Sequence, residues 1–402
     1  MTELSTPPDW ATALLGEGTA LVSVLAGGSS RETLLLEVPA GRGRVVARHD
    51  RGAGPLSGTP FTLAREAATF AAVAGAGLTA PALVAVAPDG SAFAVEEVAG
   101  TPETSDVALD DYLECLGRLH ATGTTLAPAG HAGFDAAGVE DLALWQDAAA
   151  QLATPSPILD LAFDRLRAHG AFEPDRVVLC HGDAGTGNYL HDGSQVTGLI
   201  DWEMAHTGDA HDDLASVAVR AALNGVDLGD LAARITAHHT PASGIAFDPA
   251  RHRISVLGVL TRMVVSCLRA LEQAAPHTDR SIQLLGLPLM EVHLLRTIGT
   301  LDDHHLAPLD DADPDLSFAA SLASATADHL TATLSSAVDH GVAAQARRLR
   351  FAATQMAAAL AAAGSAPSDG SDLDGLWRAA QRRLAVLPAS RPLANAPIAG
   401  VS

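Results

Sequence analysis

Short apolar runs bounded by glycine, proline and acidic residues dominate the first hundred residues of the chain. Runs of this kind are typical of β-strands, and they predict strands at residues 20–25, 33–38, 43–49, 81–86 and 92–98. Residues 10–15 predict a short helix instead. Residues 61–70 predict a second helix, because Leu63, Ala67 and Phe70 recur at helical spacing. The N-terminal part is therefore expected to be a small β-rich unit.

After residue 100 the apolar positions recur mainly at helical spacing. The predicted helices cover residues 109–122, 139–152, 158–169, 210–224, 227–239, 249–275 and 279–300. Two short strands, at residues 176–179 and 196–200, lie among these helices, and an Asp192-Gly193 turn precedes the second. This order predicts a larger, mainly helical unit in which strands hold one polar loop.

Beyond Leu301 the chain becomes acidic and turn-prone, and an alanine- and leucine-rich segment with helical periodicity follows at 317–363, then a helix at 373–384. We expect three parts: residues 1–100, residues 101–300 and a helical extension at 301–402. The sequence leaves three roles open for the extension. It could dock on the second part, form a homodimer contact or make a separate bundle.

The composition indicates a soluble globular protein, with 48% apolar and 18% charged residues. No basic-then-apolar leader is visible and no apolar run approaches the roughly 20 residues of a membrane helix, so we expect no membrane association. Three widely spaced cysteines indicate a reducing cytoplasm rather than a disulfide framework or a zinc cluster. The formal charge of −22 argues against nucleic-acid binding and is compatible with a cationic substrate.

All 25 basic residues are arginine. The absence of lysine excludes a Walker-type phosphate loop, which needs a lysine on the phosphates, and a Schiff-base enzyme. It also excludes any kinase mechanism that places a lysine on the ATP phosphates.

The most informative stretch is the polar loop from His181 to Asn188, followed thirteen residues after Asn188 by Asp201. A strand before the loop and a hairpin after it bring Asp183, Asn188 and Asp201 near one another. Asp183 can accept a proton, and an amide with a second carboxylate suits a hard cation. Phosphoryl transfer needs this combination, and kinases likewise place four residues between the catalytic Asp and the metal-binding Asn.

Simpler interpretations exist for each motif. Asp183 and Asn188 could be ordinary turn residues that bond to their own backbone. His206, His211 and Asp212 could pass for metal ligands, which would indicate a metal hydrolase, but without a helix-spaced histidine pair we interpret them as solvated loop residues.

The chain resembles the aminoglycoside phosphotransferase and choline kinase family, through His181-Gly182-Asp183 with Asn188, Asp201-Trp202-Glu203, Gly208-Asp209 and Asp213-Leu214-Ala215. The branch it resembles most is the bacterial "phosphotransferase family protein" branch, related to the kinase domain fused to some acyl-CoA dehydrogenases. The resemblance covers roughly three quarters of the chain. It implies an α+β, bilobal protein-kinase-like fold. It also implies that Asp183 is the catalytic base, that Asn188 and Asp201 bind Mg²⁺, and that His181 and Asp213 brace the loop.

The same resemblance assigns nucleotide contacts to the β-rich part. The turn containing Gly27, Gly28, Ser29 and Ser30 would cover the phosphates, although most such turns are plain hairpins. A kinase would have lysine at Arg48, on the phosphates and paired to a helix glutamate.

Glu66 is the candidate partner of Arg48. The alternative is that Arg48 is an exposed strand arginine and Glu66 an exposed helix glutamate. The backbone from Glu96 to Val98 would meet the adenine edge, before a hinge at residues 99–102.

The preferred function is an ATP- and Mg²⁺-dependent O-phosphotransferase that acts on a small-molecule hydroxyl, with GTP as an alternative nucleotide. The acceptor would be an antibiotic such as an aminoglycoside or macrolide, or a hydroxylated metabolite. Four acidic residues of the C-terminal helical region could face a cationic acceptor, namely Asp227, Asp230, Glu272 and Glu291. Because Arg48 replaces lysine, the alternative is a catalytically weak, nucleotide-binding pseudokinase that acts through its helical extension.

Overall fold

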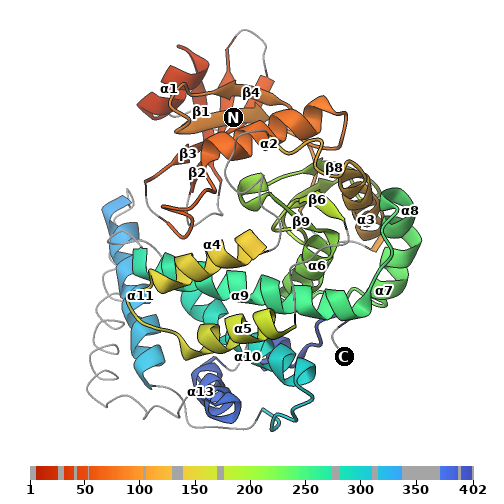
Figure 1. Ribbon diagram of the computed structural model, residues 1–402. Coiled ribbons are helices and arrows are strands. Elements are labelled where there is room, and N and C mark those ends of the chain that lie inside the picture. Colours follow the sequence, from red (N-terminus) through yellow and green to blue (C-terminus); the bar gives the residue numbers. More distant parts are fainter. Residues whose placement is uncertain are drawn as a thin grey trace.

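The computed structural model describes residues 6–25, 31–39, 43–52, 54–102, 106–128, 139–169, 176–273, 281–309, 316–336, 372–387 and 391–400. Figure 1 shows two lobes, a small β-rich lobe above and a larger helical lobe below. The expected bilobal α+β arrangement is thereby confirmed. The boundaries at residues 100 and 300 stay a prediction.

The small lobe is built on one antiparallel five-stranded sheet in the order β1-β2-β3-β5-β4. Its strands are β1 (Ala20–Val24), β2 (Arg31–Val38), β3 (Gly43–Asp50), β4 (Leu83–Val86) and β5 (Ala92–Glu96). Each strand coincides with an apolar run of the sequence. The register between β2 and β3 is continuous over eight pairs, from Arg31 opposite Asp50 to Val38 opposite Gly43.

Helices cover both faces of the sheet. Helix α1 (Asp9–Leu15) shares an apolar cluster with Val45 of β3, and α2 (Leu63–Gly75) packs its Phe70 against Phe93 of β5 at 5.7 Å between ring centroids. Because side chains alternate along a strand, every second residue of β3 faces away from α1. The strand therefore presents a charged residue toward the interlobe space.

The larger lobe contains a long helical core. Its helices are α3 (Asp106–Ala121), α4 (Val139–Ala150), α5 (Pro157–Ala168), α6 (Ala210–Asn224), α7 (Leu231–Arg234), α8 (Thr240–Ser243), α9 (Pro249–Gln273) and α10 (Ser281–Leu301). The helix predicted at 227–239 is wrong as a single element. The structure has a turn, then α7, then a π-helical segment at Ile235–His239 that runs into α8.

Two small antiparallel strand pairs lie between the lobes. They are β6 (Val177–Cys180) with β9 (His206–Asp209), and β7 (Tyr189–His191) with β8 (Val196–Leu199). The β7–β8 hairpin confirms the Asp192-Gly193 turn. Strand β9 was not expected, because its sequence His-Thr-Gly-Asp is polar; pairing with β6 makes it a strand.

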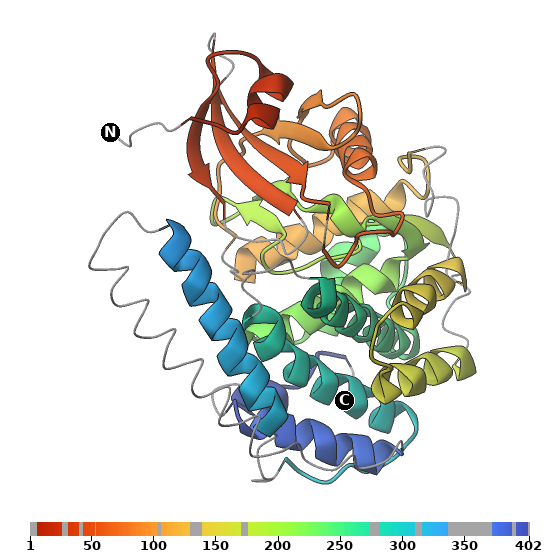
Figure 2. The ribbon, with the colours of Figure 1, turned by 90° about the vertical axis from the view of Figure 1, so that its left-hand side faces the viewer.

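The described part of the C-terminal extension packs on the larger lobe, as Figure 2 shows for α11 and α13. Its helices are α11 (Leu316–Ser336), α13 (Leu373–Ala385) and α14 (Arg391–Asn395). Phe318 shares an apolar cluster with Leu284 of α10, and Arg383 pairs with Glu291 of α10 at 2.6 Å. Docking is therefore the role that the described residues support, while a homodimer contact stays a prediction. The rest of the helix predicted at 317–363 lies outside the described residues.

Helices α9 and α10 are long and apolar enough to cross a membrane by length and composition alone. The expectation that no apolar run approaches that length is therefore wrong for these two helices. Two thirds of each apolar window (67%) is buried inside the fold, and α9 packs against α4, α5, α6 and α10. Both helices thus serve as core helices of the larger lobe.

Three buried histidines make stability depend on pH. Burial lowers the pKa of His239 to about 3 and the pKa values of His252 and His293 to about 4. In the unfolded chain these groups titrate near 6.5, so unfolding takes up protons between about pH 4 and 6.5. We expect the contribution of these three histidines to the unfolding free energy to be fully present above pH 6.5. This contribution should fall toward pH 4, by at most about 1.4 kcal/mol per pH unit for each histidine.

Urea unfolding across this pH range measures the effect. His293→Gln, which keeps a donor to the carbonyl oxygen of Leu393 (3.1 Å in the native contact), should remove about one third of the histidine part of the pH dependence. The exposed His305→Gln is the control. A pH dependence in His293→Gln equal to that of the wild type would contradict the prediction.

Candidate active site

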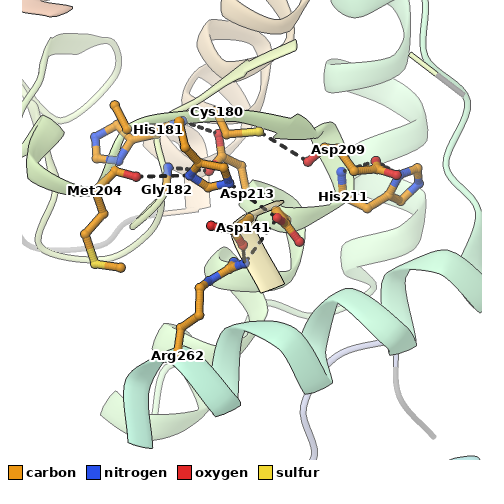
Figure 3. Close-up of polar contacts among 12 residues, drawn as sticks. Asp141, Cys180, His181, Gly182, Met204, Asp209, His211, Asp213 and Arg262 are labelled. Atoms are coloured by element: carbon orange, nitrogen blue, oxygen red, sulfur yellow. Dashed lines mark hydrogen bonds and ion pairs between the residues drawn. The ribbon is translucent and has the colours of Figure 1, made fainter. Parts of the chain in front are cut away.

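The polar loop begins where β6 ends, and Asp213 near the start of α6 holds it. The carboxylate of Asp213 accepts hydrogen bonds from the backbone N–H of His181 (2.7 Å) and of Gly182 (2.9 Å), as Figure 3 shows. Gly182 has a φ of 85°, and a Cβ at this position would lie 1.9 Å from the carbonyl oxygen of Met204. Only glycine therefore fits between the loop and the residues that precede β9.

Two buried histidines complete this support. His120 of α3 lies 2.9 Å from Asp213 through its Nε2. Burial raises the pKa of Asp213, but the hydrogen bond and charge of His120 and the charge of His181 outweigh it, and the pKa falls to about 2. His181 Nε2 lies 2.8 Å from the carbonyl oxygen of Ile200, and its ring packs on Trp202 at 4.5 Å. His181 thus links the loop to the end of β8.

Asp183 and Asn188 face each other across the loop. The Asn188 amide nitrogen donates to the backbone oxygen of Asp183 and to its Oδ2, both at 2.7 Å. Because both contacts use the nitrogen, the carboxamide oxygen is the atom left for a cation. The two side chains are therefore bonded to each other within the loop.

Arg220 of α6 is the site residue that the sequence did not reveal. Its Nη1 donates to both carboxylate oxygens of Asp183, at 2.8 and 2.7 Å. Its Nε and Nη2 donate to the carbonyl oxygen of Thr186, at 3.1 and 2.8 Å. The available signal was that Arg220 is the only charged residue between Leu214 and Leu223.

Asp201 follows β8 in the left-handed conformation, with a φ of 64°. Among the described residues Asp303 is the only other non-glycine residue with positive φ, and such backbone strain concentrates at functional sites. A backbone hydrogen bond connects the hairpin to the polar loop: the N–H of Ile200 donates to the carbonyl oxygen of Asn188 at 3.0 Å. The hairpin thereby brings Asp201 beside the loop.

Arg48 of β3 bridges the lobes through three carboxylates. It donates to Glu66 in a short buried contact, to Asp201 at 2.6 Å and to Glu203 at 3.0 Å. Arg48 is 8% exposed and Glu66 is 1% exposed, so the alternative of two exposed residues is wrong. Glu203 was not among the predicted site residues.

The charges of this cluster shift one another. Burial, followed by the neighbouring carboxylates, raises the pKa of Glu66 to about 8 despite Arg48. Burial and Asp201 likewise raise the pKa of Glu203 to about 7. Burial works against the charge of Arg48, yet the three carboxylates together raise its pKa. One guanidinium thus serves three acids, and the cluster has a formal excess of negative charge.

A cavity of about 710 Å³ lies between the lobes and is lined by residues of both. Predicted site residues that line it are Arg48, Glu66, Glu96, Val98, Asp183, Asn188 and Asp201. Leu25 and Thr33, which flank the predicted phosphate turn, also line it. Gly27, Gly28, Ser29 and Ser30 themselves lie outside the described residues.

The predicted adenine contact involves the backbone of residues 96–98. The N–H of Glu96 donates to Ala82 and the N–H of Glu97 donates to Arg44, at 2.9 and 3.1 Å. Among the described residues none accepts a hydrogen bond from the N–H of Val98. The cavity wall here is apolar, with Val95 and Leu35.

A separate group of histidines and aspartates, which the sequence offered as possible metal ligands, is held together by an arginine. His206 and His211 are 4% and 3% exposed, so their interpretation as solvated loop residues is wrong. Asp141, His206 and Asp212 have ligand atoms within 4.8 Å of one another. Arg262 already pairs with Asp141 at 3.1 Å and with Asp212 at 3.3 Å, as Figure 3 shows for Asp141. A buried guanidinium supplies the positive charge that a metal would bring.

A model of the phosphotransferase enzyme family matches residues 22–254, which is more than half of the chain. This chain belongs to the phosphotransferase enzyme family. The matched range contains the loop, the hairpin, Arg48 and Arg220. A comparison of this phosphotransferase with curated proteins finds no match.

Solved structures show the same fold. The choline kinase LicA from Streptococcus pneumoniae has 13% identity and a TM-score of 0.50, covering 70% of this chain and 94% of its own. The aminoglycoside phosphotransferase APH(4)-Ia has 14% identity and a TM-score of 0.50, with 70% and 94% covered. The macrolide 2'-phosphotransferase MphH from Brachybacterium faecium has 17% identity and a TM-score of 0.47, with 65% and 90% covered. The two structures with a TM-score of 0.50 show that this phosphotransferase has the kinase-like fold expected from its sequence.

Proposed function

We propose that this phosphotransferase transfers the γ-phosphoryl group of ATP to a hydroxyl group of a small molecule, with GTP as the alternative nucleotide. The observation that carries the proposal is the position of Asp183 and Arg220. Both line the interlobe cavity, and both also line a second cavity on the side of α9 and α10. A phosphoryl donor in one cavity and an acceptor alcohol in the other could therefore meet at the carboxylate of Asp183.

The larger cavity has the features that a nucleotide requires. Arg48, held by Glu66, supplies a fixed positive charge in the wall of the cavity where the phosphates would lie. The backbone of Glu96 and Val98 would meet the base at the other end of the cavity. Residues 27–30 would cover the phosphates, as the sequence predicts.

The donor set fits Mg²⁺. Asn188 offers an amide oxygen and Asp201 a carboxylate, and Mg²⁺ prefers such oxygen ligands together with substrate phosphates. The three carboxylates around a single Arg48 leave negative charge that a divalent cation would neutralise. When bound, the ion would reduce the charge on the phosphate oxygens. Asn188 and Asp201 would hold it.

Asp183 would position the acceptor hydroxyl and receive its proton. As the bond from the acceptor oxygen to the γ-phosphorus forms, the bond to the bridging oxygen breaks and ADP leaves. The pairing with Arg220 restrains the orientation of the carboxylate. Phosphoryl transfer needs little base strength, because its transition state is loose and orientation matters most.

The test is ADP release and product formation with purified protein, Mg·ATP and a panel of small alcohols. Acceptor-dependent ADP above the background hydrolysis supports transfer. The pseudokinase alternative rests on arginine at position 48. It predicts nucleotide-dependent thermal stabilisation with no acceptor-dependent ADP for any compound.

Arg48→Lys tests the bridge between the lobes. One ammonium cannot reach all the carboxylates that Arg48 binds through two nitrogens. We expect a loss of about 1.5–3 kcal/mol in unfolding free energy, the range for a charge-assisted hydrogen bond, together with a higher KM for ATP. Urea unfolding and initial-rate kinetics measure the two effects.

The matched control is Arg51→Lys, an exposed arginine on the same side of the lobe that lies 3.8 Å from Glu32. It should change neither quantity. Wild-type stability and KM in Arg48→Lys would show that Arg48 does not hold the site together.

We also propose that the protein works in the cytoplasm. The support is that Cys115, Cys180 and Cys267 are free and buried, which suits a reducing compartment. The absence of nucleic-acid and membrane partners and the homodimer contact stay predictions.

A further inference from the structure

A second cavity, of about 210 Å³, lies between the polar loop and helices α9 and α10. It shares Asp183 and Arg220 with the interlobe cavity, so a ligand in it would face the end of the nucleotide across these two side chains. Its volume is below the roughly 300–1,000 Å³ of pockets that hold drug-sized ligands. The space therefore suits a compact group.

Methionine concentrates in this cavity. Three of the five methionines in the chain line it, namely Met204, Met263 and Met290, together with Val259 and Cys267. Methionine is flexible and polarizable and adapts to irregular apolar shapes. The walls thus favour an apolar body without a fixed outline.

The charges of the cavity disfavour a cationic ligand. Among the described lining residues Asp183 is the only acid, whereas Arg220 and Arg262 are both cations. Asp183 is already paired with Arg220, and Arg262 is paired with carboxylates behind the wall. A cationic ligand in this cavity would be repelled by the two arginines and would find no unpaired carboxylate among the described lining residues.

The four acids that the sequence offered for a cationic acceptor have other contacts. Glu291 pairs with Arg383, and Glu272 accepts from the backbone of Ala153. The remaining two bind backbone N–H groups of their own segment, Asp227 that of Gly229 and Asp230 that of Ala233. None of the four lines either cavity.

Two polar groups in the wall could orient a neutral ligand. The Ser266 hydroxyl and the Gln283 side-chain oxygen are buried and have no hydrogen-bond partner in the part of the chain that the structure describes, and both residues line this cavity. Buried polar groups normally find partners. A ligand hydroxyl or a water molecule would satisfy them.

We propose that the acceptor is a compact, uncharged alcohol with an apolar body, bound in this methionine-lined cavity with its hydroxyl toward Asp183. The proposal rests on the phosphotransferase function proposed above. It excludes polyamines and quaternary ammonium alcohols as preferred acceptors. The reaction is the phosphoryl transfer proposed above: the alcohol oxygen takes the γ-phosphoryl group, ADP leaves and the proton passes to Asp183.

The test compares pairs of alcohols that have nearly the same shape but differ in charge. 3,3-Dimethylbutan-1-ol and choline are one such pair, and other branched or cyclic alcohols with their amino counterparts extend the panel. ADP release and mass-spectrometric detection of the phosphate ester measure turnover. Saturation-transfer NMR with Mg²⁺ and a non-hydrolysable ATP analogue measures binding without turnover.

We expect the neutral member of each reacting pair to have at least about tenfold higher kcat/KM. Better turnover or binding of the cationic members overturns the inference and leaves the proposed function standing. If neutral alcohols bind but no phosphate ester forms, the proposed function is wrong and the assignment of the cavity as a binding site for neutral alcohols is kept. Binding of neither class overturns the cavity assignment.

Met263→Glu and Met263→Gln form a matched pair in the cavity wall. The carboxylate should reduce kcat/KM for neutral alcohols at least about tenfold and narrow their advantage over amino alcohols, whereas the amide should retain the preference. Asp227→Asn, outside the cavity, is the control and should leave acceptor preference unchanged. An unchanged preference in a folded Met263→Glu protein, checked by its thermal melting, contradicts the proposal.

Discussion

Asp183→Asn lowers kcat by about 10²–10⁴-fold, the contribution of a positioned general base, and leaves Mg·ATP affinity nearly unchanged. The reason is the position of Asp183 where the two cavities meet, while the proposed nucleotide and metal contacts lie on other residues. Asparagine is the better replacement than alanine. Its side-chain oxygen can still accept from Arg220, which would otherwise lose its carboxylate partner.

Single-turnover kinetics and nucleotide titration by calorimetry separate these two quantities. The control is Asp192→Asn at the tip of the β7–β8 hairpin, an exposed aspartate whose turn contacts an amide oxygen can keep. Its kcat should equal that of the wild type. Full activity in Asp183→Asn would show that Asp183 takes no part in the mechanism. The position of Asp183 between the two cavities would then no longer support the proposed function.

Asp201→Asn abolishes the Mg²⁺ dependence of nucleotide binding and leaves the fold at least as stable as the wild type. Loss of even an outer-shell partner typically lowers metal affinity about 10–100-fold, so removal of a ligand charge should reach or exceed this range. Stability should survive because Arg48 keeps Glu66 and Glu203 as partners, and one of three crowded carboxylates loses its charge. Asparagine also tolerates the left-handed backbone at this position.

Nucleotide titrations with and without Mg²⁺, and urea unfolding of the same samples, check both halves of this expectation. The Asp192→Asn protein again serves as the control. Retention of Mg²⁺-dependent binding in Asp201→Asn would assign the metal to other residues. A large loss of stability would instead make Asp201 a structural partner of Arg48.

Local pattern was sufficient for much of the fold. The five strands of the small lobe and the β7–β8 hairpin appear where apolar runs and turn residues predicted them. The family likewise followed from short motifs, because the loop and hairpin need particular residues at close sequence spacing. Gly182 illustrates this point: its lack of a Cβ is required by a neighbouring carbonyl oxygen.

Polar sequences that depend on distant partners were misread. Strand β9 exists because β6 pairs with it, and its histidine is buried although its sequence is polar. The helix expected at 227–239 begins only at Leu231 and contains a π-helical segment at Ile235–His239 before α8. For β9, pairing with a distant strand overrode local preference.

The sequence by itself determined the family and predicted Asp183, Asn188 and Asp201 as site residues, since these lie within nineteen positions on one loop and hairpin. Only the tertiary structure decided that Arg220 restrains Asp183, and that Arg48 binds three carboxylates rather than one. It also decided that three methionines, and none of the four candidate acids, line the cavity beyond Asp183. The physical reason is that these contacts join residues from separate helices and strands, and the packing of those elements leaves no periodic trace in the chain.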